Sequence, residues 1–170
     1  MTREAILPTP LPPSLEIPAA ELLATARALK AQGRFDMLLD VTAVDWPGRD
    51  LRFDVVWHFY STITFARVRV KTRVAEADPA VDSLLPLYGS ALFMERECHE
   101  MYGIAFRGHP DLRPILLYEG FVGHPLRKDY PIRLEQPLVV YRKETLSPAL
   151  SQGRGSASTP SLGRGQGEGQ

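Results

Sequence analysis

The sequence predicts an α+β fold, a small and mainly antiparallel sheet packed with helices and followed by a long irregular segment. Residues 18–33 carry apolar side chains at helical spacing, and three stretches between residues 35 and 74 alternate apolar and polar residues. A chain of 170 residues is long enough for one domain with extensions. We therefore expect a flexible Pro-rich arm (1–16), an α+β domain (17–103), an irregular segment (104–145) and a disordered low-complexity tail (146–170).

Composition excludes several classes of protein. The 20 basic and 20 acidic residues give a formal net charge of zero, so no overall field favours nucleic acid or an anionic membrane as partner. The single cysteine, Cys98, has no partner for an internal disulfide and cannot alone hold a zinc ion or an iron-sulfur cluster. No run of apolar residues approaches the length of a membrane span, and the first residues lack the pattern of a signal peptide. We expect a cytosolic bacterial protein.

The first elements follow from periodicity. A helix begins at Pro18, repeats apolar residues from Leu22 to Leu29 and ends at Gly33. Alternation then predicts a strand over residues 35–46, a turn at 46–50 and a second strand over 51–60. In the first strand, the residues expected to face the core are Phe35, Met37, Leu39, Val41 and Ala43.

A third strand over residues 64–74 has apolar residues on one side and a row of four basic residues on the other. This row consists of Arg67, Arg69, Lys71 and Arg73. A solvated outer face, or an edge protected against aggregation, is the favoured interpretation. A docking surface for an acidic partner is the alternative. After it, Asp78 and Pro79 predict the start of a short helix that Pro86 and Gly89 interrupt.

A helix over residues 91–102 carries the densest group of charged residues. Its expected buried arc contains Cys98, which we interpret as a small core residue. Arg96, Glu97 and Glu100 fall on the opposite side. Because an arginine adjoins the two carboxylates, structural or interface pairing is favoured over acid–base chemistry or a metal site. Glu95 and His99 are expected to form a surface pair.

Residues 104–145 combine prolines and glycines with many apolar side chains, whereas a disordered linker would be more polar. Such a segment cannot readily bury itself, so we expect it to dock on another protein. Phe106, Phe121 and Tyr130 would be its apolar anchors, and polar contacts would come from Arg113, Arg127, Lys128 and Asp129. A chain truncated after Gly103 should then still fold.

The segment contains Phe-x-Gly-His-Pro twice, with His109 and His124 as its histidines. Glycine before and proline after each histidine favour a rigid corner in which the imidazole bonds backbone groups. A metal or catalytic role is the less favoured alternative, because the nearest acids, Asp111, Glu119 and Asp129, show no recognisable ligand spacing.

The stretches "ERECHEMYGIAFRGHPDLRPIL" and "GFVGHPLRKDYP" together resemble the 30 kDa subunit (the C subunit in bacteria) of respiratory complex I, the proton-pumping NADH:quinone oxidoreductase. The pattern covers residues 95–131. Glu100 stands where the family commonly has Asp, and Pro114 where it frequently has a basic residue.

The resemblance implies a structural subunit of the peripheral arm, without catalytic residues of its own, that docks on the large (49 kDa type) quinone-site subunit. It implies no cofactor in this chain, with FMN and iron-sulfur clusters in partner subunits. It also implies a peripheral location on the cytoplasmic side of the bacterial membrane, reached only through the complex.

The equivalent subunit of an energy-converting hydrogenase or formate-linked complex is the near alternative. A stand-alone metal enzyme using Glu97, Glu100 and His109 is the distant one. The family motif and candidate interface comprise Glu95, Arg96, Glu97, Glu100, Phe106, His109, Arg113, Phe121, His124, Arg127, Lys128, Asp129 and Tyr130.

Overall fold

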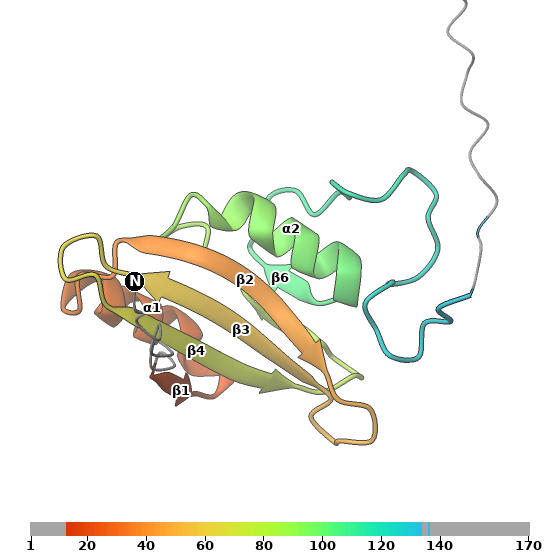
Figure 1. Cartoon of the computed structure of the whole chain (residues 1–170), viewed down its shortest axis with the longest axis horizontal. Coiled ribbons are helices and arrows are strands. Elements are labelled where there is room, and N and C mark those ends of the chain that lie inside the picture. The colour runs from red at the N-terminus through yellow and green to blue at the C-terminus, as the bar shows by residue number, and fades with distance from the viewer. Residues whose placement is uncertain (1–12, 134–135, 137–170) are drawn as a thin grey trace, which may run out of the picture. The chain divides into compact units, whose positions relative to one another are not determined.

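A computed structural model describes residues 13–133 and 136 of the chain. Within these residues the elements follow the order β1, α1, β2, β3, β4, β5, α2 and β6, with a 3₁₀ turn at Ala19–Glu21 (Figure 1). Their bounds are β1 Ser14–Glu16, α1 Leu22–Ala31, β2 Met37–Asp45, β3 Phe53–Tyr60, β4 Arg67–Val74, β5 Ala80–Asp82, α2 Ala91–Tyr102 and β6 Ala105–Arg107. The predicted α+β class is confirmed.

The main sheet has the strand order β1-β4-β3-β2. β2, β3 and β4 form an antiparallel meander, as their alternation and short turns predict. β1 joins the other side of β4 in parallel, with Ser14 opposite Arg69 and Glu16 opposite Lys71. Residues 14–16 therefore lie in the sheet, although the sequence places them in a flexible arm. Residues 1–12 of that arm lie outside the described residues.

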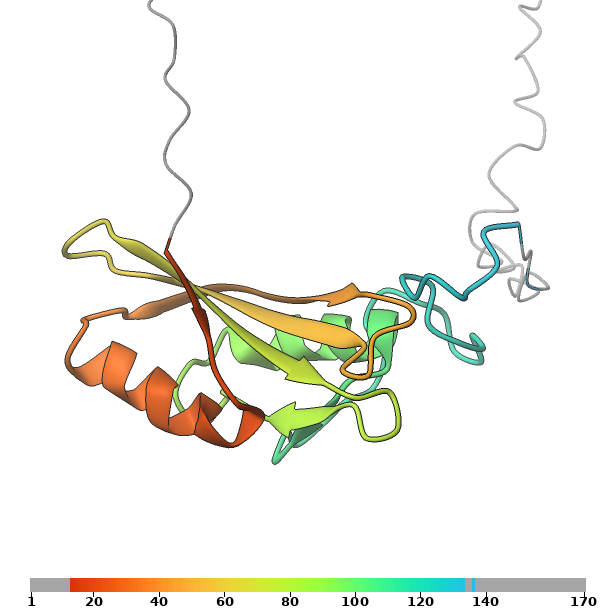
Figure 2. The ribbon, with the colours of Figure 1, turned by 90° about the horizontal axis from the view of Figure 1, so that it is seen from below.

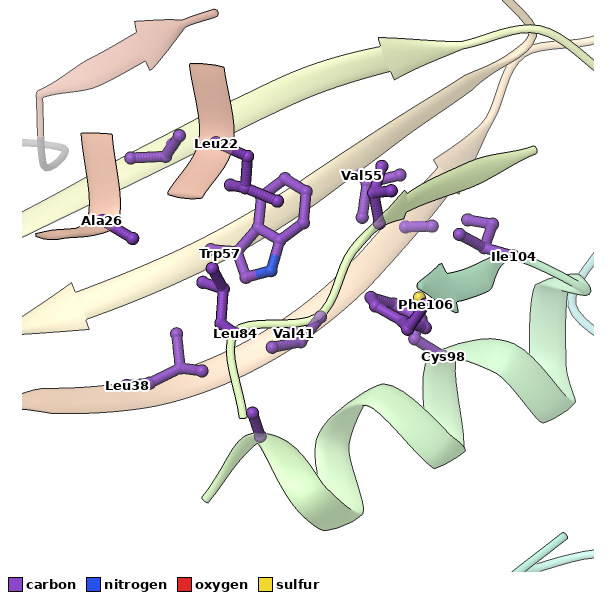
Figure 3. Close-up of a cluster of buried hydrophobic side chains, with 14 of the residues drawn as sticks. Leu22, Ala26, Leu38, Val41, Val55, Trp57, Leu84, Cys98, Ile104 and Phe106 are labelled. Atoms are coloured by element: carbon purple, nitrogen blue, oxygen red, sulfur yellow. The ribbon is translucent and has the colours of Figure 1, made fainter. Parts of the chain in front are cut away.

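The core fills the space between one face of this sheet and the two helices. Phe53, Val55 and Trp57 of β3 are fully buried there. Figure 3 shows Val55 and Trp57 with Leu22 of α1 and Cys98 of α2 on the helix side of the sheet. Both helices lie on the same side of the sheet (Figure 2). The buried position predicted for Cys98 is thus confirmed, and burial raises the pKa of its thiol.

The inward residues of β2 agree with the prediction at Val41 and Ala43, which are buried, and differ from it before them. The register against β3 shifts between Leu38 and Asp40, so that Leu39 is an extra residue in the ladder. A bulge of this kind reverses the alternation on one side of it. As a result Leu38 is buried, whereas Met37 and Leu39, both predicted to face the core, are exposed.

The short helix predicted from Asp78 is wrong. Ala80–Asp82 form β5, which pairs in parallel with β6, so Val81 lies opposite Phe106. Ile104 and Phe106 are buried in the main core (Figure 3). The folded domain therefore extends through Arg107, beyond the predicted boundary at residue 103. Phe106 is a core residue and not an interface anchor, and truncation after Gly103 would remove part of the core.

α2 begins and ends as predicted, closing at Gly103, which has a left-handed φ of 75°. Beyond β6 the described chain is irregular. In the part of the chain that the structure describes, the helices are too short or too polar to cross a membrane. The predicted tail at residues 146–170 lies outside the described residues.

Candidate docking site along helix α2

The irregular segment from residue 108 to 133, which we call the docking segment, runs along one side of α2. Three groups of α2, each one helical turn from the next, bind its first half: the carbonyl of Leu92 and the side chains of Arg96 and Glu100. The Leu92 carbonyl lies 3.1 Å from Nε2 of His109. Arg96 donates through Nε to the Arg113 carbonyl at 2.8 Å. Glu100 accepts the next amides. Positions i, i+4 and i+8 of a helix share one side, so the segment is fixed parallel to the helix axis.

Glu100 accepts hydrogen bonds from three successive backbone amides. Ile115, Leu116 and Leu117 donate to its carboxylate at 3.2, 3.0 and 2.6 Å. Consecutive amides that point to one place form a concave site for an anion, and here the helix supplies that anion. The predicted placement of Glu100 on an outer face is therefore wrong, because the segment buries the side chain to 5% exposure.

Arg96 binds backbone carbonyls as well. Its Nη2 donates to the Pro114 carbonyl at 3.2 Å, next to the bond from Nε to Arg113. The guanidinium is therefore directed at the docking segment, whereas the sequence predicts pairing with the carboxylates of its own helix.

The second half of the segment caps the C-terminal end of α2. Nδ1 of His124 lies 2.9 Å from the Glu100 carbonyl, the Leu126 amide donates to the Met101 carbonyl, and Nε of Arg127 donates to the Tyr102 carbonyl at 2.6 Å. The last carbonyls of a helix have no partner within the helix, and these groups satisfy three of them.

Gly103 is required at this junction. Its positive φ disfavours other residues, and a Cβ placed there would lie 2.5 Å from His124 Nε2 and Arg127 Nη2.

Both histidines thus bond backbone groups, as expected of structural corners. His109 uses its other nitrogen as well, because Nδ1 accepts from the Asp111 amide at 3.1 Å. Asp111 in turn pairs with Arg113 at 2.7 Å, and this guanidinium lowers the pKa of Asp111. Arg113 therefore contacts its own segment.

A buried arginine that the sequence analysis missed ties the segment to the sheet. Arg52 donates two hydrogen bonds to the carboxylate of Asp45, at 2.7 and 2.8 Å, in a bidentate pair. Its Nη1 also donates to Glu76 at 2.6 Å and to Asp129 at 3.0 Å. The backbone amide of Lys128 adds a bond to Asp45 at 2.7 Å. The Arg52 hydrogen bonds lower the pKa of both Asp45 and Asp129. No spacing in the sequence relates Arg52 to residue 129.

The aromatic residues of the segment pack on one another. The ring of Phe121 stacks against the ring of Tyr130, with 6.0 Å between the ring centroids. It also meets the ring of Tyr118 edge-on, with 5.5 Å between the centroids. Gln136 donates to the Tyr130 hydroxyl at 2.8 Å. Phe121 and Tyr130, predicted as anchors for a partner, therefore shape the segment itself, and their role at an interface stays a prediction.

Glu95 is buried inside the domain. Ser83 Oγ and the Leu84 amide donate to its carboxylate at 2.6 and 2.7 Å. Burial raises the pKa of Glu95 to about 7. The predicted surface pair of Glu95 with His99 is wrong, because the His99 ring instead contacts the Ile104 carbonyl at 2.8 Å.

The three residues of the metal-enzyme alternative, Glu97, Glu100 and His109, have separate roles. Glu97 is exposed, whereas Glu100 and His109 bind backbone groups of the chain. Among residues 13–133 and 136, no three His, Cys, Asp or Glu side chains are placed to hold a metal ion.

The docking segment is thus bound to the domain mainly through its backbone groups, through His124 and Arg127 and through Asp129, and it leaves several apolar side chains in solvent. Its strongly exposed apolar residues are Leu116, Val122, Leu126 and Ile132, which are 62%, 75%, 46% and 100% exposed. Isolated exposed apolar residues are ordinary, but four of them on one irregular segment are typical of a surface that another protein covers. The arrangement is suited to binding a protein.

Comparison with known proteins agrees with this architecture. The family model for the respiratory-chain NADH dehydrogenase 30 kDa subunit matches residues 15–136. The C subunit of the NADH-quinone oxidoreductase of Citrifermentans bemidjiense is 46% identical over 112 residues, which cover 66% of this chain and 70% of that protein. The C/D subunit of the NADH-quinone oxidoreductase of Bdellovibrio bacteriovorus is 43% identical over 122 residues, or 72% of this chain, and the chain spans only 22% of that relative.

Among solved structures, a trypsin-resistant fragment (1-134) of Nqo5 has 32% sequence identity and a TM-score of 0.55. The alignment covers 58% of this chain and 81% of that one. The family match includes most of the main sheet, both helices and the docking segment, and so extends well beyond residues 95–131, which carry the resemblance noted above. The chain therefore belongs to the family of the 30 kDa subunit of respiratory-chain NADH dehydrogenase.

Proposed function

We propose that this chain is a non-catalytic scaffold subunit of the peripheral arm of a proton-translocating NADH:quinone oxidoreductase, docked on the large quinone-site subunit through its docking segment. The observation that carries the proposal is that the segment binds its own domain through polar contacts while several of its apolar side chains stay exposed. Its backbone groups, with Arg127 and Asp129, bind α2 and the sheet, so the exposed apolar residues Leu116, Val122, Leu126 and Ile132 remain for a partner.

The C/D relative supports the choice of partner. In that protein, the part similar to this chain occupies 22% of a longer polypeptide whose name combines the letters of two subunits. Two subunits that occur as one polypeptide are close neighbours when they occur as two. We infer that the counterpart of the remaining, D-type part is the large quinone-site subunit on which this chain docks.

Redox chemistry belongs to other subunits in this proposal. Cys98 lies in the apolar core, where burial disfavours the thiolate that would bind iron or act as a nucleophile. FMN and iron-sulfur clusters are accordingly assigned to partners. The chain would lie on the cytoplasmic side of the bacterial membrane and associate with it through the complex.

The test introduces charge into the exposed apolar residues and follows assembly in native membranes. L116D/V122D should lower co-purification of the large subunit at least ten-fold, because central interface residues are typically worth about 2 kcal/mol each. The control A24D/A28D adds the same charge to exposed positions of α1 and should leave co-purification unchanged. Circular dichroism verifies that both variants fold.

Wild-type recovery of the large subunit with L116D/V122D would contradict the docking site. Mass spectrometry of the co-purified proteins distinguishes the complexes, because hydrogenase or formate dehydrogenase subunits in place of NADH dehydrogenase subunits would favour the near alternative. A monomer with one tightly bound metal per chain would instead favour the enzyme.

A further inference from the structure

The face of the main sheet that points away from the helices is formed by alternate residues of β2, β3 and β4 (Figure 2). On β3 these residues alternate with the buried Phe53, Val55, Trp57 and Phe59. The pairing register places His58 opposite Arg69 and Tyr60 opposite Arg67 on this outer face. No helix among the described residues covers it.

Three cations on this face lack an acidic partner among the described residues. Arg73 pairs with Glu16 at 2.8 Å and lies 3.7 Å from Asp54, whereas Arg67, Arg69 and Lys71 form no such pair there. Nε of Arg69 is buried without a hydrogen-bond partner in the same residues. A buried donor without an acceptor costs free energy, which marks this part of the basic row as unsatisfied within the described residues.

The same face has apolar features beside the cations. A cavity of about 340 Å³ is lined by Leu39, Asp40, His58, Phe59 and Arg67. Burial lowers the pKa of His58, and Arg69 and Arg67 lower it further whereas Asp40 raises it. The cavity therefore sets Arg67, with Asp40 beside it, next to the apolar side chains of Leu39 and Phe59, an arrangement that can take an acidic group next to an apolar one.

The β3–β4 hairpin beside this cavity ends in two exposed apolar side chains, Ile63 at 60% and Phe65 at 74% exposure. Phe65 has a φ of 58°, which is rare for a residue with a side chain. The turn is held in this shape by bonds from the Thr62 amide to Asp36 and from the Phe65 amide to the Ser61 carbonyl, at 2.8 and 2.9 Å. A fixed turn thus keeps an aromatic ring in solvent.

We propose that the outer face of β3 and β4, together with the hairpin tip, is a second protein-docking surface that takes an acidic segment of a partner protein carrying apolar side chains. The basic row supplies the charge complementarity, and Ile63, Phe65 and the cavity supply the apolar contacts. The docking segment meets the opposite end of β3, at Arg52, so the two surfaces are separate (Figure 1).

Other occupants fit less well. The chain's own ends are not acidic, because residues 1–12 hold one basic and one acidic residue and residues 137–170 hold four basic and two acidic ones. The same face of a second copy would repel the basic row. A uniform polyanion such as nucleic acid or an anionic membrane carries charge at every position and would meet the exposed Asp40 and Glu16, which are interleaved with the cations.

The test places the photo-crosslinker benzoylphenylalanine at Ile63 of the full chain in native membranes. The expected product is a crosslink to one partner protein at a peptide of net negative charge. Arg67→Glu should reduce the yield at least five-fold, and Lys71→Glu should act in the same direction. Arg27→Glu makes the same charge change at an exposed position of α1 and should leave the yield unchanged. Thermal unfolding verifies that each variant is folded.

The proposal is overturned by no crosslink, or by a crosslink to lipid, nucleic acid, a second copy or a neutral or basic peptide. Equal losses of yield with Arg67→Glu and Arg27→Glu would also overturn it. The test is independent of the first docking site, since L116D/V122D changes recovery of the large subunit and leaves the hairpin intact.

Discussion

In the sheet-and-helix core, the six largest fully buried side chains are apolar, and Trp57, Phe53 and Phe59 among them pack between the sheet and the helices. The docking segment lies against the same domain by different means. Charged side chains of the domain, chiefly Arg96, Glu100 and Arg52, bind its backbone carbonyls, backbone amides and Asp129. The core is held by apolar burial and the segment by polar contacts, which leaves several apolar side chains of the segment exposed.

The largest expected change in stability tests whether Phe106 belongs to the core or to an interface. Phe106→Ala removes a ring that is 2% exposed and should lower the free energy of unfolding by about 3–5 kcal/mol, as Phe-to-Ala changes in cores do. Leu116→Ala, at an exposed position of the segment, should change it by less than about 0.5 kcal/mol. Urea unfolding measures both. If both variants lost the same small amount of unfolding free energy, Phe106 would be an interface residue and not a core residue.

A somewhat smaller loss of stability is expected from removing Arg52, which links the core to the docking segment through Asp45 and Asp129. Arg52→Ala leaves Asp45 buried without its two-pronged partner, and breaking such a pair typically costs about 3 kcal/mol. It also frees Asp129 from the sheet, so trypsin should cleave between residues 127 and 133 faster. The matched Arg73→Ala, at a half-exposed position, should leave both stability and cleavage close to wild type. Identical behaviour of the two variants would show that Arg52 does not join the regions.

Glu100→Gln probes the segment by itself. The amide replaces one acceptor oxygen with a donor that faces the backbone amides of residues 115–117, at a cost of about 1–3 kcal/mol. Hydrogen exchange should speed up at these amides and not in β3. Glu97→Gln, on the exposed side of α2, is the control and should change neither. Faster exchange throughout β3 would mean that core and segment unfold as one unit.

The last effect depends on pH and concerns the carboxyl group of Glu95, which is fully buried in the domain. The pKa of Glu95 is raised to about 7 in the fold, against 4.5 for its ordinary value. Between these pH values the native state keeps a proton that the unfolded chain releases, so stability from this group falls as pH rises. Glu95→Gln should therefore gain stability relative to wild type from pH 5 to pH 8, by at most about 3 kcal/mol. Denaturant unfolding at both pH values measures the gain, and its absence would contradict the raised pKa.

Much of the core could be predicted from the sequence. Helical spacing gave α1 and α2, alternation gave β2, β3 and β4, and the arc of α2 gave the buried Cys98. These properties depend on residues that are neighbours along the chain. The bulge at Leu39 is the exception, since an extra residue in one strand becomes visible only when the partner strand is aligned.

The candidate site could be predicted only in outline. The sequence marked the residues of α2 and of the segment, but it placed Glu95 and Glu100 at the surface and Phe106 at an interface. A carboxylate is buried only where donors are supplied, and these come from residues 83–84 for Glu95 and 115–117 for Glu100.

The sequence alone therefore determined the α+β class, the long elements, the charge balance and the family. Only the tertiary structure decided which charged groups lie inside, because their partners are distant in the chain and no local period records them. Arg52 shows this most clearly, since it joins Asp45, Glu76 and Asp129 from three separate parts of the sequence.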